Sequence, residues 1–268
     1  MSRKYIGLWL ILSISLILVL LFSLSDIEVD TGRGPLKKAP FREHIFAKKS
    51  DGERRGKKSR VVDMVDNEGN PVEESSLAEV DSTQHSILLI GDSMTLNIAY
   101  AMSRYAKQNG HKFHAVNWDS SNTRIWSASD TLSHFIREFG ATYIFISLGS
   151  NELYLKNPDS RRPDVRRILD MVGERPYIWI GPPNWKEDFG INDMLAEECR
   201  SGSFFRSAGM EFERKKDRVH PTRHASELWV DSIMRWMPKS AHPILANVPS
   251  DSLGKVDPHV TFLKALNK

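Results

Sequence analysis

Four short predicted strands, three of them continuous apolar runs, alternate with stretches of helical periodicity. This alternation limits the folds open to the chain more than any other feature. The four strands lie at residues 86–90, 112–116, 143–147 and 177–180, and a weaker strand lies at 203–206. Continuous apolar runs of this length are typical of strands buried inside a sheet. The periodicity outside them predicts helices over residues 95–108, 128–139, 161–172 and 223–237.

The alternation of strands and helices predicts an α/β fold. Such a pattern gives parallel βαβ units, and so one mostly parallel sheet covered by helices on both faces in three α/β/α layers. In sheets of this kind, reactive groups collect at the carboxyl ends of the strands. The polar motifs of this chain each follow a predicted strand or precede the last predicted helix. We therefore expect them to meet at one edge of the sheet.

Length and composition narrow the classes of protein further. The chain has 268 residues, which is enough for one sizeable domain with appendages, and its net charge of +3 does not indicate a nucleic-acid partner. Its single cysteine, Cys199, excludes an intrachain disulfide framework and a multi-cysteine metal site, and we expect a packed thiol. His220 and His224 have a spacing that suits a metal, but no third ligand accompanies them. We expect no metal and no cofactor.

The apolar N-terminus predicts a membrane anchor. Residues 5–24 carry no charge and follow Arg3 and Lys4. Twenty residues at helical rise span about 30 Å, the thickness of the hydrocarbon core of a bilayer. No small-residue cleavage site follows, so we favour a retained signal anchor over a cleaved signal peptide or a buried core helix. The domain after it is then expected in the periplasm or outside the cell.

The segment after the anchor has the composition of a tether. Residues 33–60 are rich in Lys and Arg, whereas residues 61–81 hold seven acidic residues and no basic one. Neither block has enough apolar surface to offset chain entropy. The basic block suits anionic lipid or an acidic glycan, although a solvated linker is the simpler interpretation. We divide the chain into a cytoplasmic stub and anchor, a flexible tether, an α/β domain and a C-terminal extension, at residues 1–25, 26–84, 85–240 and 241–268.

Gly91-Asp92-Ser93 follows the first predicted strand. Glycine lets the chain turn sharply, and Ser93 would begin the next helix with its hydroxyl facing a cleft. The start of a helix also directs backbone N–H groups and positive dipole at any oxyanion that forms there. On its own, the motif fits a simple helix cap equally well, with Ser93 as the N-cap and Asp92 as a turn former.

Asp217 and His220 lie three residues apart, just before the last predicted helix. A serine hydroxyl is a poor nucleophile until a base takes its proton, and histidine titrates in the right range. A carboxylate must fix the tautomer of that histidine, and this spacing presents both side chains from one tight turn, which Pro221 stiffens. Taken alone, the motif would favour a polar loop that caps a helix.

Two further loops offer hydrogen-bond donors for an oxyanion. Asn151 follows the third strand in the sequence Gly149-Ser150-Asn151-Glu152, and its amide donates without titrating. The loop after the second strand, residues 117–123, is the place for another donor. An asparagine in a turn after a strand is also common without any function.

In this order, the motifs resemble the blocks of the SGNH (GDSL-like) hydrolase family over residues 86–237. Gly91-Asp92-Ser93 matches the nucleophile block, and Asp217-Arg218-Val219-His220 matches the Asp-x-x-His block. The sequence at 149–152 is similar to the Gly-x-Asn-Asp/Glu block, and Gly181-Pro182-Pro183 also fits. The resemblance implies a flavodoxin-like sheet and a divergent, membrane-anchored serine hydrolase, with Ser93, His220 and Asp217 as nucleophile, base and orienting acid.

The resemblance further implies an oxyanion hole made by the N–H groups of Ser93 and Asn122 and the side chain of Asn151. Where the family usually has a glycine, this register places Asn122. Asparagine is the residue other than glycine that best tolerates left-handed backbone, which would let its N–H keep the required direction. In the implied mechanism, Ser93 forms an acyl-enzyme, and water or a sugar hydroxyl then takes the acyl group.

Trp118, Trp126, Tyr154 and Trp185 lie in loops predicted to surround the cleft. Aromatic faces suit sugar rings, although ordinary packing explains each residue taken singly. We therefore expect a serine esterase that removes acetyl or other acyl groups from an envelope polysaccharide or another glycan. Open alternatives are an O-acyltransferase on a cell-surface glycan, a lipid esterase or thioesterase, and a catalytically weak glycan-binding protein on the same fold.

Overall fold

The computed structural model describes residues 78–264 of the chain. In chain order the helices and strands are β1 (Ser86–Gly91), α3 (Met94–Gln108), β2 (Lys112–Trp118), α4 (Thr123–Ser127), α5 (Thr131–Glu138), β3 (Tyr143–Ser147), α6 (Arg162–Val172), β4 (Tyr177–Ile180), α7 (Ile191–Glu198), β5 (Phe204–Phe205), α8 (Arg223–Trp236) and β6 (His259–Leu263). Short 3₁₀ turns join them: η2 (Ser150–Glu152), η3 (Pro158–Arg161), η4 (Met237–Lys239) and η5 (Asp251–Leu253).

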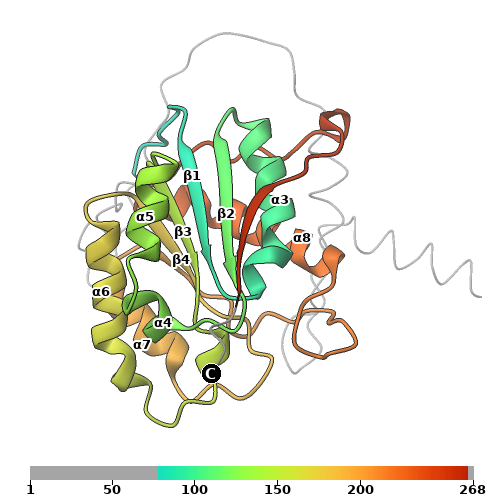
Figure 1. Ribbon diagram of the computed structural model, residues 1–268. Coiled ribbons are helices and arrows are strands. Elements are labelled where there is room, and N and C mark those ends of the chain that lie inside the picture. Colours follow the sequence, from blue (N-terminus) through green and yellow to red (C-terminus); the bar gives the residue numbers. More distant parts are fainter. Residues whose placement is uncertain (1–77, 265–268) are drawn as a thin grey trace, which may run out of the picture. The chain divides into compact units, whose positions relative to one another are not determined.

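The strands form a six-stranded sheet in the order β5-β4-β3-β1-β2-β6, and every neighbouring pair is parallel. Their carboxyl ends therefore lie along one edge of the sheet, at the bottom of Figure 1. The strand order reverses between β1 and β3, which in doubly wound sheets is where a crevice for ligands opens. The α/β fold with a parallel sheet is confirmed.

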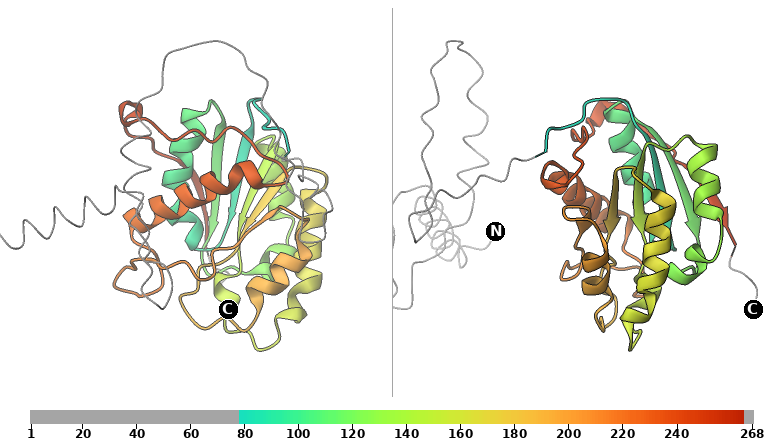
Figure 2. Two further views of the ribbon diagram at one scale, coloured as in Figure 1. Left: turned by 180° about the vertical axis from the view of Figure 1, so that it is seen from behind. Right: turned by 90° about the vertical axis from the view of Figure 1, so that its left-hand side faces the viewer.

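Helices cover both faces of the sheet (Figure 1, Figure 2). Helices α5, α6 and α7 pack on one face, and α3 and α8 pack on the other. Side chains alternate along β1, so Leu88 and Ile90 belong to the first core while Ile87 and Leu89 belong to the second. Because both faces of β1 are buried, its sequence has the continuous apolar run that predicts the strand.

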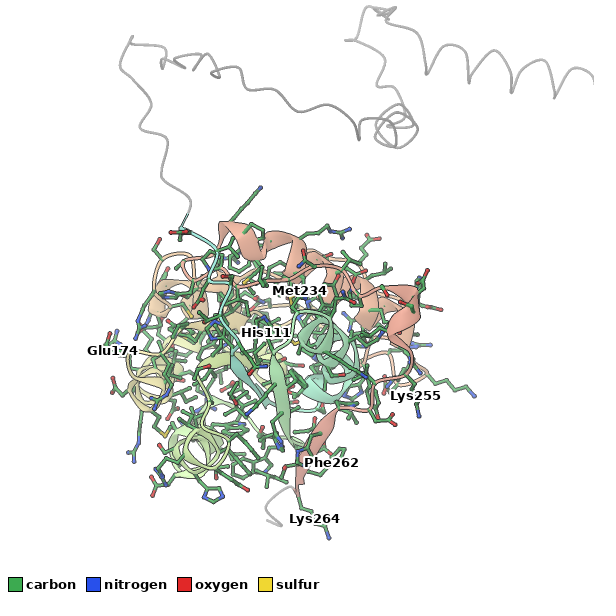
Figure 3. All side chains as sticks on the ribbon, turned by 90° about the horizontal axis from the view of Figure 1, so that it is seen from above. His111, Glu174, Met234, Lys255, Phe262 and Lys264 are labelled. Carbon is green, nitrogen blue, oxygen red and sulfur yellow. The ribbon has the colours of Figure 1, made fainter. Side chains whose placement is uncertain are left out.

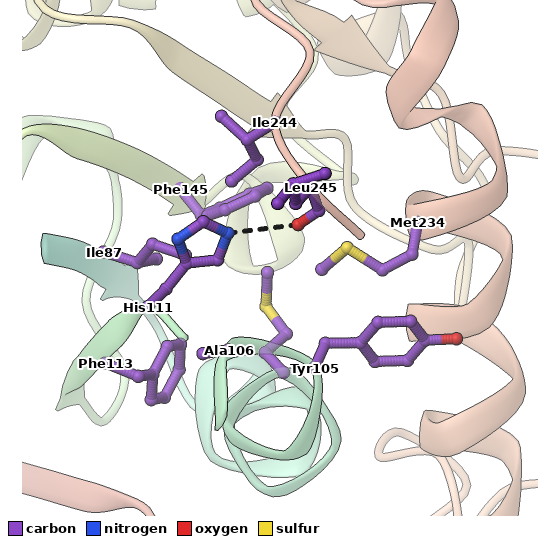
Figure 4. Close-up of a pocket in the computed structure, with 10 residues that line it drawn as sticks. Ile87, Tyr105, Ala106, His111, Phe113, Phe145, Met234, Ile244 and Leu245 are labelled. Carbon is purple, nitrogen blue, oxygen red and sulfur yellow. Dashed lines mark hydrogen bonds between the residues drawn. The ribbon is translucent and has the colours of Figure 1, made fainter. Parts of the chain in front are cut away.

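The core under α3 and α8 contains a small, partly open cavity (Figure 4). Apolar side chains line it together with His111, whose Nε2 lies 3.1 Å from the carbonyl oxygen of Leu245. Its volume of about 10 Å³ is room for roughly one water molecule. His111 precedes β2, so the cavity lies toward the amino ends of the strands, the end from which Figure 3 views the molecule. The cavity therefore belongs to the core and not to the polar motifs, which follow the opposite ends of the strands.

Two helices differ from the expected pattern. The helix expected over residues 128–139 is α5, which is shorter at its start. The short helix α4 before it lies where a loop was expected, because Asn122 accepts the N–H of Ile125 at 3.1 Å and so caps a separate turn of helix. Helix α7 is not among the expected elements. It starts where Asp188 Oδ1 accepts the N–H groups of Gly190 at 2.9 Å and Ile191 at 2.7 Å. Both differences arise from side-chain caps and not from apolar periodicity.

The segment expected to be a C-terminal extension completes the sheet. Strand β6 pairs with β2 in a register that sets His114 opposite His259. Nearby, the N–H of Asp81 donates to the carbonyl of Pro243 at 2.8 Å. The boundaries expected at residues 84 and 240 therefore both fall inside one packed unit. Strand β6 is half exposed at the sheet edge, so it lacks the apolar run that marks the inner strands.

The membrane anchor and most of the tether, residues 1–77, lie outside the described residues. No helix within residues 78–264 combines the length and the apolarity needed to cross a bilayer.

His114 should make the fold less stable at mildly acidic pH. The residue is 5% exposed, and its ring stacks on Phe139 with centroids 3.4 Å apart. Its Nδ1 lies 2.9 Å from Nδ1 of His259. Burial lowers the pKa of His114 to about 4, and His259 adds to the effect. The unfolded chain therefore binds a proton near pH 6.5 that the folded chain binds only near pH 4. The free energy of unfolding should therefore fall by up to about 3 kcal/mol as the pH drops from 6.5 to 4.

Urea unfolding across this pH range measures the effect in wild type and in His114→Gln. Because glutamine does not titrate, the variant should lose less stability between neutral and acidic pH than the wild type. Equal pH dependence in the two proteins would contradict the assignment to His114.

Candidate active site

The segment that carries Ser93 turns sharply at the carboxyl end of β1. A Cβ atom on Gly91 would lie 2.0 Å from the carbonyl oxygen of Ser147 in β3, so only glycine fits at this crossing. The N–H of Asp92 donates to the same carbonyl at 3.2 Å, and Asp92 Oδ1 accepts the N–H of Met94 at 2.9 Å. These contacts place Ser93 at the N-cap position of α3, as the sequence predicts.

Asp217 and His220 face each other across a tight turn. Asp217 Oδ1 accepts the N–H of Val219 at 2.8 Å and the N–H of His220 at 3.0 Å. Between them, Arg218 takes a left-handed φ of 59°. The N–H of Lys215 donates to the carbonyl of His220 at 2.8 Å and ties the turn to the preceding segment. Both side chains are thus presented from one turn.

The structure joins Ser93, His220 and Asp217 in one hydrogen-bonded chain. His220 Nε2 lies 2.8 Å from Ser93 Oγ, and His220 Nδ1 lies 2.8 Å from Asp217 Oδ2. The hydrogen bond from His220, followed by the N–H groups of the turn, holds the pKa of Asp217 well below its usual range. An ionised carboxylate only accepts, so Nδ1 carries the ring proton and Nε2 can take the proton of Ser93.

Two residues outside the sequence motifs connect the nucleophile to this turn. Asn97 Nδ2 donates to the carbonyl of Ser93 at 3.3 Å, and Lys215 Nζ donates to Asn97 Oδ1 at 2.8 Å. The spacing of four residues between Ser93 and Asn97 on a helix is a weak sequence signal for the first contact. Nothing in the sequence predicts the second.

Asn151 lies in η2, directly after β3. The turn is possible because Gly149 takes a φ of 116°. Asn151 Nδ2 donates one hydrogen to the carbonyl of Ser121 at 2.8 Å, so it links η2 to the loop after β2. Trp185 Nε1 holds the same turn by donating to the carbonyl of Ser150 at 3.0 Å. The second amide hydrogen of Asn151 has no acceptor within residues 78–264.

Asn122 adopts a different conformation from the one expected. Its backbone is extended, with φ of −149° and ψ of 178°, and the left-handed residue of this loop is Ser120, with φ of 59°. The Asn122 side chain caps α4 through the N–H of Ile125. The expectation of a left-handed Asn122 in the place of glycine is therefore wrong, and helix capping explains an asparagine here.

The N–H of Asn122 also points away from Asn151. Asn151 bonds the carbonyl of Ser121, and the C=O and N–H of a trans peptide point in opposite directions. The N–H of Asn122 belongs to that same peptide group, so it lies on the far side. The structure therefore does not bring these two donors to one point. Like the N–H of Ser93, that of Asn122 has no hydrogen-bond partner within residues 78–264.

The four aromatic residues expected around the cleft divide into two pairs. Trp118 and Trp126 are buried and meet edge to face with centroids 5.3 Å apart. Trp126 Nε1 also donates to Ser121 Oγ at 2.9 Å. Burial excludes the expected stacking of either ring on a sugar, since both belong to the core. The sequence could not separate them from exposed rings, because neighbouring polar residues give the whole loop a polar composition.

Tyr154 and Trp185 form the second pair. Tyr154 is 55% exposed, and Trp185 is partly buried beside η2. Lys186 Nζ lies 5.1 Å from the centre of the Tyr154 ring and 4.8 Å from that of Trp185. These distances are in the range of cation–π contacts. Lys186 therefore places a positive charge beside both aromatic rings.

Two buried carboxyl groups flank the nucleophile and η2. Burial raises the pKa of Asp92 to about 7, and the charge of Glu152 acts in the same direction. Glu152 is itself 3% exposed. The sequence predicts only a turn at Asp92 and no contact for Glu152, because burial of a polar residue after a strand leaves no periodic pattern. Within residues 78–264, no group of three or more His, Cys, Asp or Glu side chains is suited to hold a metal ion.

Comparisons with known proteins do not assign this chain to a family. No protein-family model and no curated protein matches the sequence. A solved structure described as a gut microbial diltiazem-metabolizing enzyme is similar, with a TM-score of 0.46 and 11% sequence identity. The match covers 59% of this chain and 48% of that chain, so this chain spans about half the length of that neighbour. Any function must be argued from the site itself.

Asp217→Asn should slow the reaction of Ser93 with a fluorophosphonate probe, which labels activated serines. Asparagine can donate to Nδ1 of His220 and so favours the tautomer with its proton on Nε2, where it no longer accepts from Ser93. Loss of the orienting carboxylate costs on the order of 10⁴ in rate in a known serine triad. The rate of labelling of the purified chain measures this, with Asp193→Asn as a control on an exposed ion pair with Arg206. Labelling of Asp217→Asn as fast as wild type would contradict the role of Asp217.

Proposed function

We propose that this chain is a serine esterase of the SGNH type, which removes acetyl or other acyl groups from an envelope polysaccharide or another glycan. The observation that carries the proposal is the hydrogen-bonded chain Ser93–His220–Asp217, with both bonds at 2.8 Å. It lies at the carboxyl ends of the strands, where α/β sheets place reactive groups. A serine, a base and an orienting carboxylate in this order are the parts that nucleophilic acyl transfer needs.

The chemistry proceeds through an acyl-enzyme. Ser93 Oγ attacks the ester carbonyl while His220 Nε2 takes the hydroxyl proton, and Asp217 stabilises the imidazolium that forms. His220 then gives that proton to the departing sugar oxygen, which breaks the ester bond and leaves the acyl group on Ser93. In the second half, His220 takes a proton from water, the hydroxide attacks the acyl carbonyl, and Ser93 recovers its proton as the acid leaves.

The tetrahedral intermediates need donors for their oxyanion. We assign this role to the N–H of Ser93, which has no hydrogen-bond partner within the described residues, and to the second amide hydrogen of Asn151. The start of α3 adds positive dipole at Ser93. The N–H of Asn122 would join them only if the Ser121–Asn122 peptide turned over.

Tyr154, Trp185 and Lys186 support a sugar as the group that carries the ester. The exposed Tyr154 ring offers an apolar face, and Trp185 contacts the carbonyl of Ser150, next to Asn151. Sugars bind such faces through their C–H groups, while a lysine donates to hydroxyl or carboxylate oxygens. A membrane anchor at residues 5–24 would hold the enzyme at an envelope surface where acylated glycans occur.

Ser93→Ala should abolish hydrolysis of 4-nitrophenyl acetate by the purified chain. The variant lacks the nucleophile but keeps the backbone N–H and the fold, so only the covalent route is lost. Release of 4-nitrophenol is followed in wild type, in Ser93→Ala and in Ser201→Ala, which alters an exposed serine of the turn before β5. Wild-type and Ser201→Ala rates should agree. Equal rates in wild type and Ser93→Ala would overturn the proposed function.

Asn151→Asp should lower kcat by about 10²–10³, the usual cost of one oxyanion donor. Aspartate has nearly the same size but no N–H to donate, and its charge would oppose the oxyanion. KM should change little, because the donor acts mainly in the transition state. Steady-state kinetics on the same ester measure both constants. A kcat within a factor of two of wild type would remove Asn151 from the oxyanion hole.

A further inference from the structure

Glu152 makes more polar contacts than any role as a surface turn residue requires. Its Oε1 accepts the hydroxyl of Thr123 at 2.7 Å and lies 2.8 Å from Arg161 Nε. Its Oε2 accepts the N–H of Thr123 at 3.1 Å. The side chain is 2% exposed and that of Arg161 is 12% exposed. A nearly buried carboxylate thus connects η2 with the first residue of α4 and the last residue of η3.

Every residue of η2 has a hydrogen-bond partner in another segment of the chain. The carbonyl of Ser150 accepts from Trp185 at 3.0 Å, and Asn151 donates to the carbonyl of Ser121 at 2.8 Å. Glu152 completes the set through Thr123. The two bonds of Glu152 to Thr123 and the bond of Asn151 to Ser121 join the same two segments, residues 121–123 and 151–152. Asn151 and Glu152, neighbours on one short turn, therefore bond the residues on either side of Asn122, Ser121 and Thr123.

A second layer supports this contact. Asp164 Oδ2 lies 3.6 Å from Arg161 Nη1, and Asp164 Oδ1 accepts the hydroxyl of Ser127 at 2.7 Å. Ser127 ends α4, so the network runs from η2 through Arg161 to both ends of that helix. Burial raises the pKa of Glu152, while the bonds from Thr123 and the charge of Arg161 act in the opposite direction. The partners of Glu152 thus offset part of the cost of burying its charge.

We propose that Glu152 is a positioning residue for the oxyanion hole: it fixes η2 against the loop after β2 so that the amide of Asn151 keeps its direction. The inference rests on the proposed function. An oxyanion donor must stay within a few tenths of an ångström of its working place, which requires side chains locked by neighbouring hydrogen bonds. Asn151 has one amide hydrogen committed to Ser121, so a shift of either loop would redirect the other hydrogen.

Glu152→Gln is the sharpest substitution because every partner of Glu152 is a donor. In the place of Oε2 the new amide N–H₂ would face the N–H of Thr123, and in the place of Oε1 it would face Arg161 Nε; neither group can accept. Arg161 also loses its nearest countercharge. Glu198→Gln is the matched control. Glu198 is a nearly buried carboxylate that contacts Arg162 at 2.9 Å and Arg166 at 2.6 Å, and it joins α6 to α7 without touching η2.

The experiment compares wild type, Ser93→Ala, Glu152→Gln and Glu198→Gln in hydrolysis of 4-nitrophenyl acetate and in inhibition by phenylboronic acid. The boronic acid forms a tetrahedral anion on an activated serine and so reports on the oxyanion hole directly. Glu152→Gln should lose about 10–100-fold in kcat with KM unchanged within about twofold, and its inhibition constant should rise by a similar factor. Glu198→Gln should keep the wild-type kcat and inhibition constant, whatever its thermal midpoint.

Thr123 gives a second test that leaves the carboxylate in place. Thr123→Ser keeps the hydroxyl and the N–H that Glu152 accepts, so its kcat should remain near that of wild type. Thr123→Val removes only the hydroxyl and should show part of the loss. Wild type no faster than Ser93→Ala would overturn the proposed function and this inference with it. An active wild type whose kcat and boronate affinity survive in Glu152→Gln, or fall equally in Glu198→Gln, would overturn the inference alone.

Discussion

The close approach of β1 to β3 at Gly91 is the constraint on which the rest of the site depends. With the carbonyl of Ser147 2.0 Å from where a Cβ atom would stand, no other residue allows the two strands to pair up to their ends. Parallel pairing to that point puts the two following turns side by side at the reversal of strand order. Ser93 starts one turn and Asn151 lies in the other. Nucleophile and proposed oxyanion donor are therefore neighbours because of the sheet and not because of their sequence spacing.

Much of this was predictable because the sheet is parallel and buried. The strands at 143–147 and 177–180 have the predicted bounds, because strands that are buried on both faces have a continuous apolar sequence. The contact of Asp217 with His220 followed from their spacing in a turn. By contrast, β6 and α7 depend on features that leave no apolar run: β6 is a half-exposed edge strand, and α7 starts at the cap made by Asp188.

The sequence predicts the residues of the candidate site that belong to a recognisable motif. It does not predict which other residues are buried and which are exposed. Nothing in the sequence separates Trp126, which is fully buried, from Tyr154, which is more than half exposed. Asn122 is a case in which two demands on one position compete. A glycine would permit left-handed backbone, whereas asparagine supplies the cap of α4, and the extended backbone of the structure satisfies the cap.

Three carboxyl groups around the site show how environment assigns different roles to one functional group. Asp217 is about half exposed and receives hydrogen bonds from His220 and two backbone N–H groups, so its pKa falls and it can orient the imidazole as an anion. Asp92 is fully buried, and this burial raises its pKa to about 7, so its role is to shape the turn. Glu152 is buried too, but each oxygen meets a donor and Arg161 supplies the countercharge. A carboxylate so completely engaged cannot act on a substrate, and what it controls is where its neighbour Asn151 points.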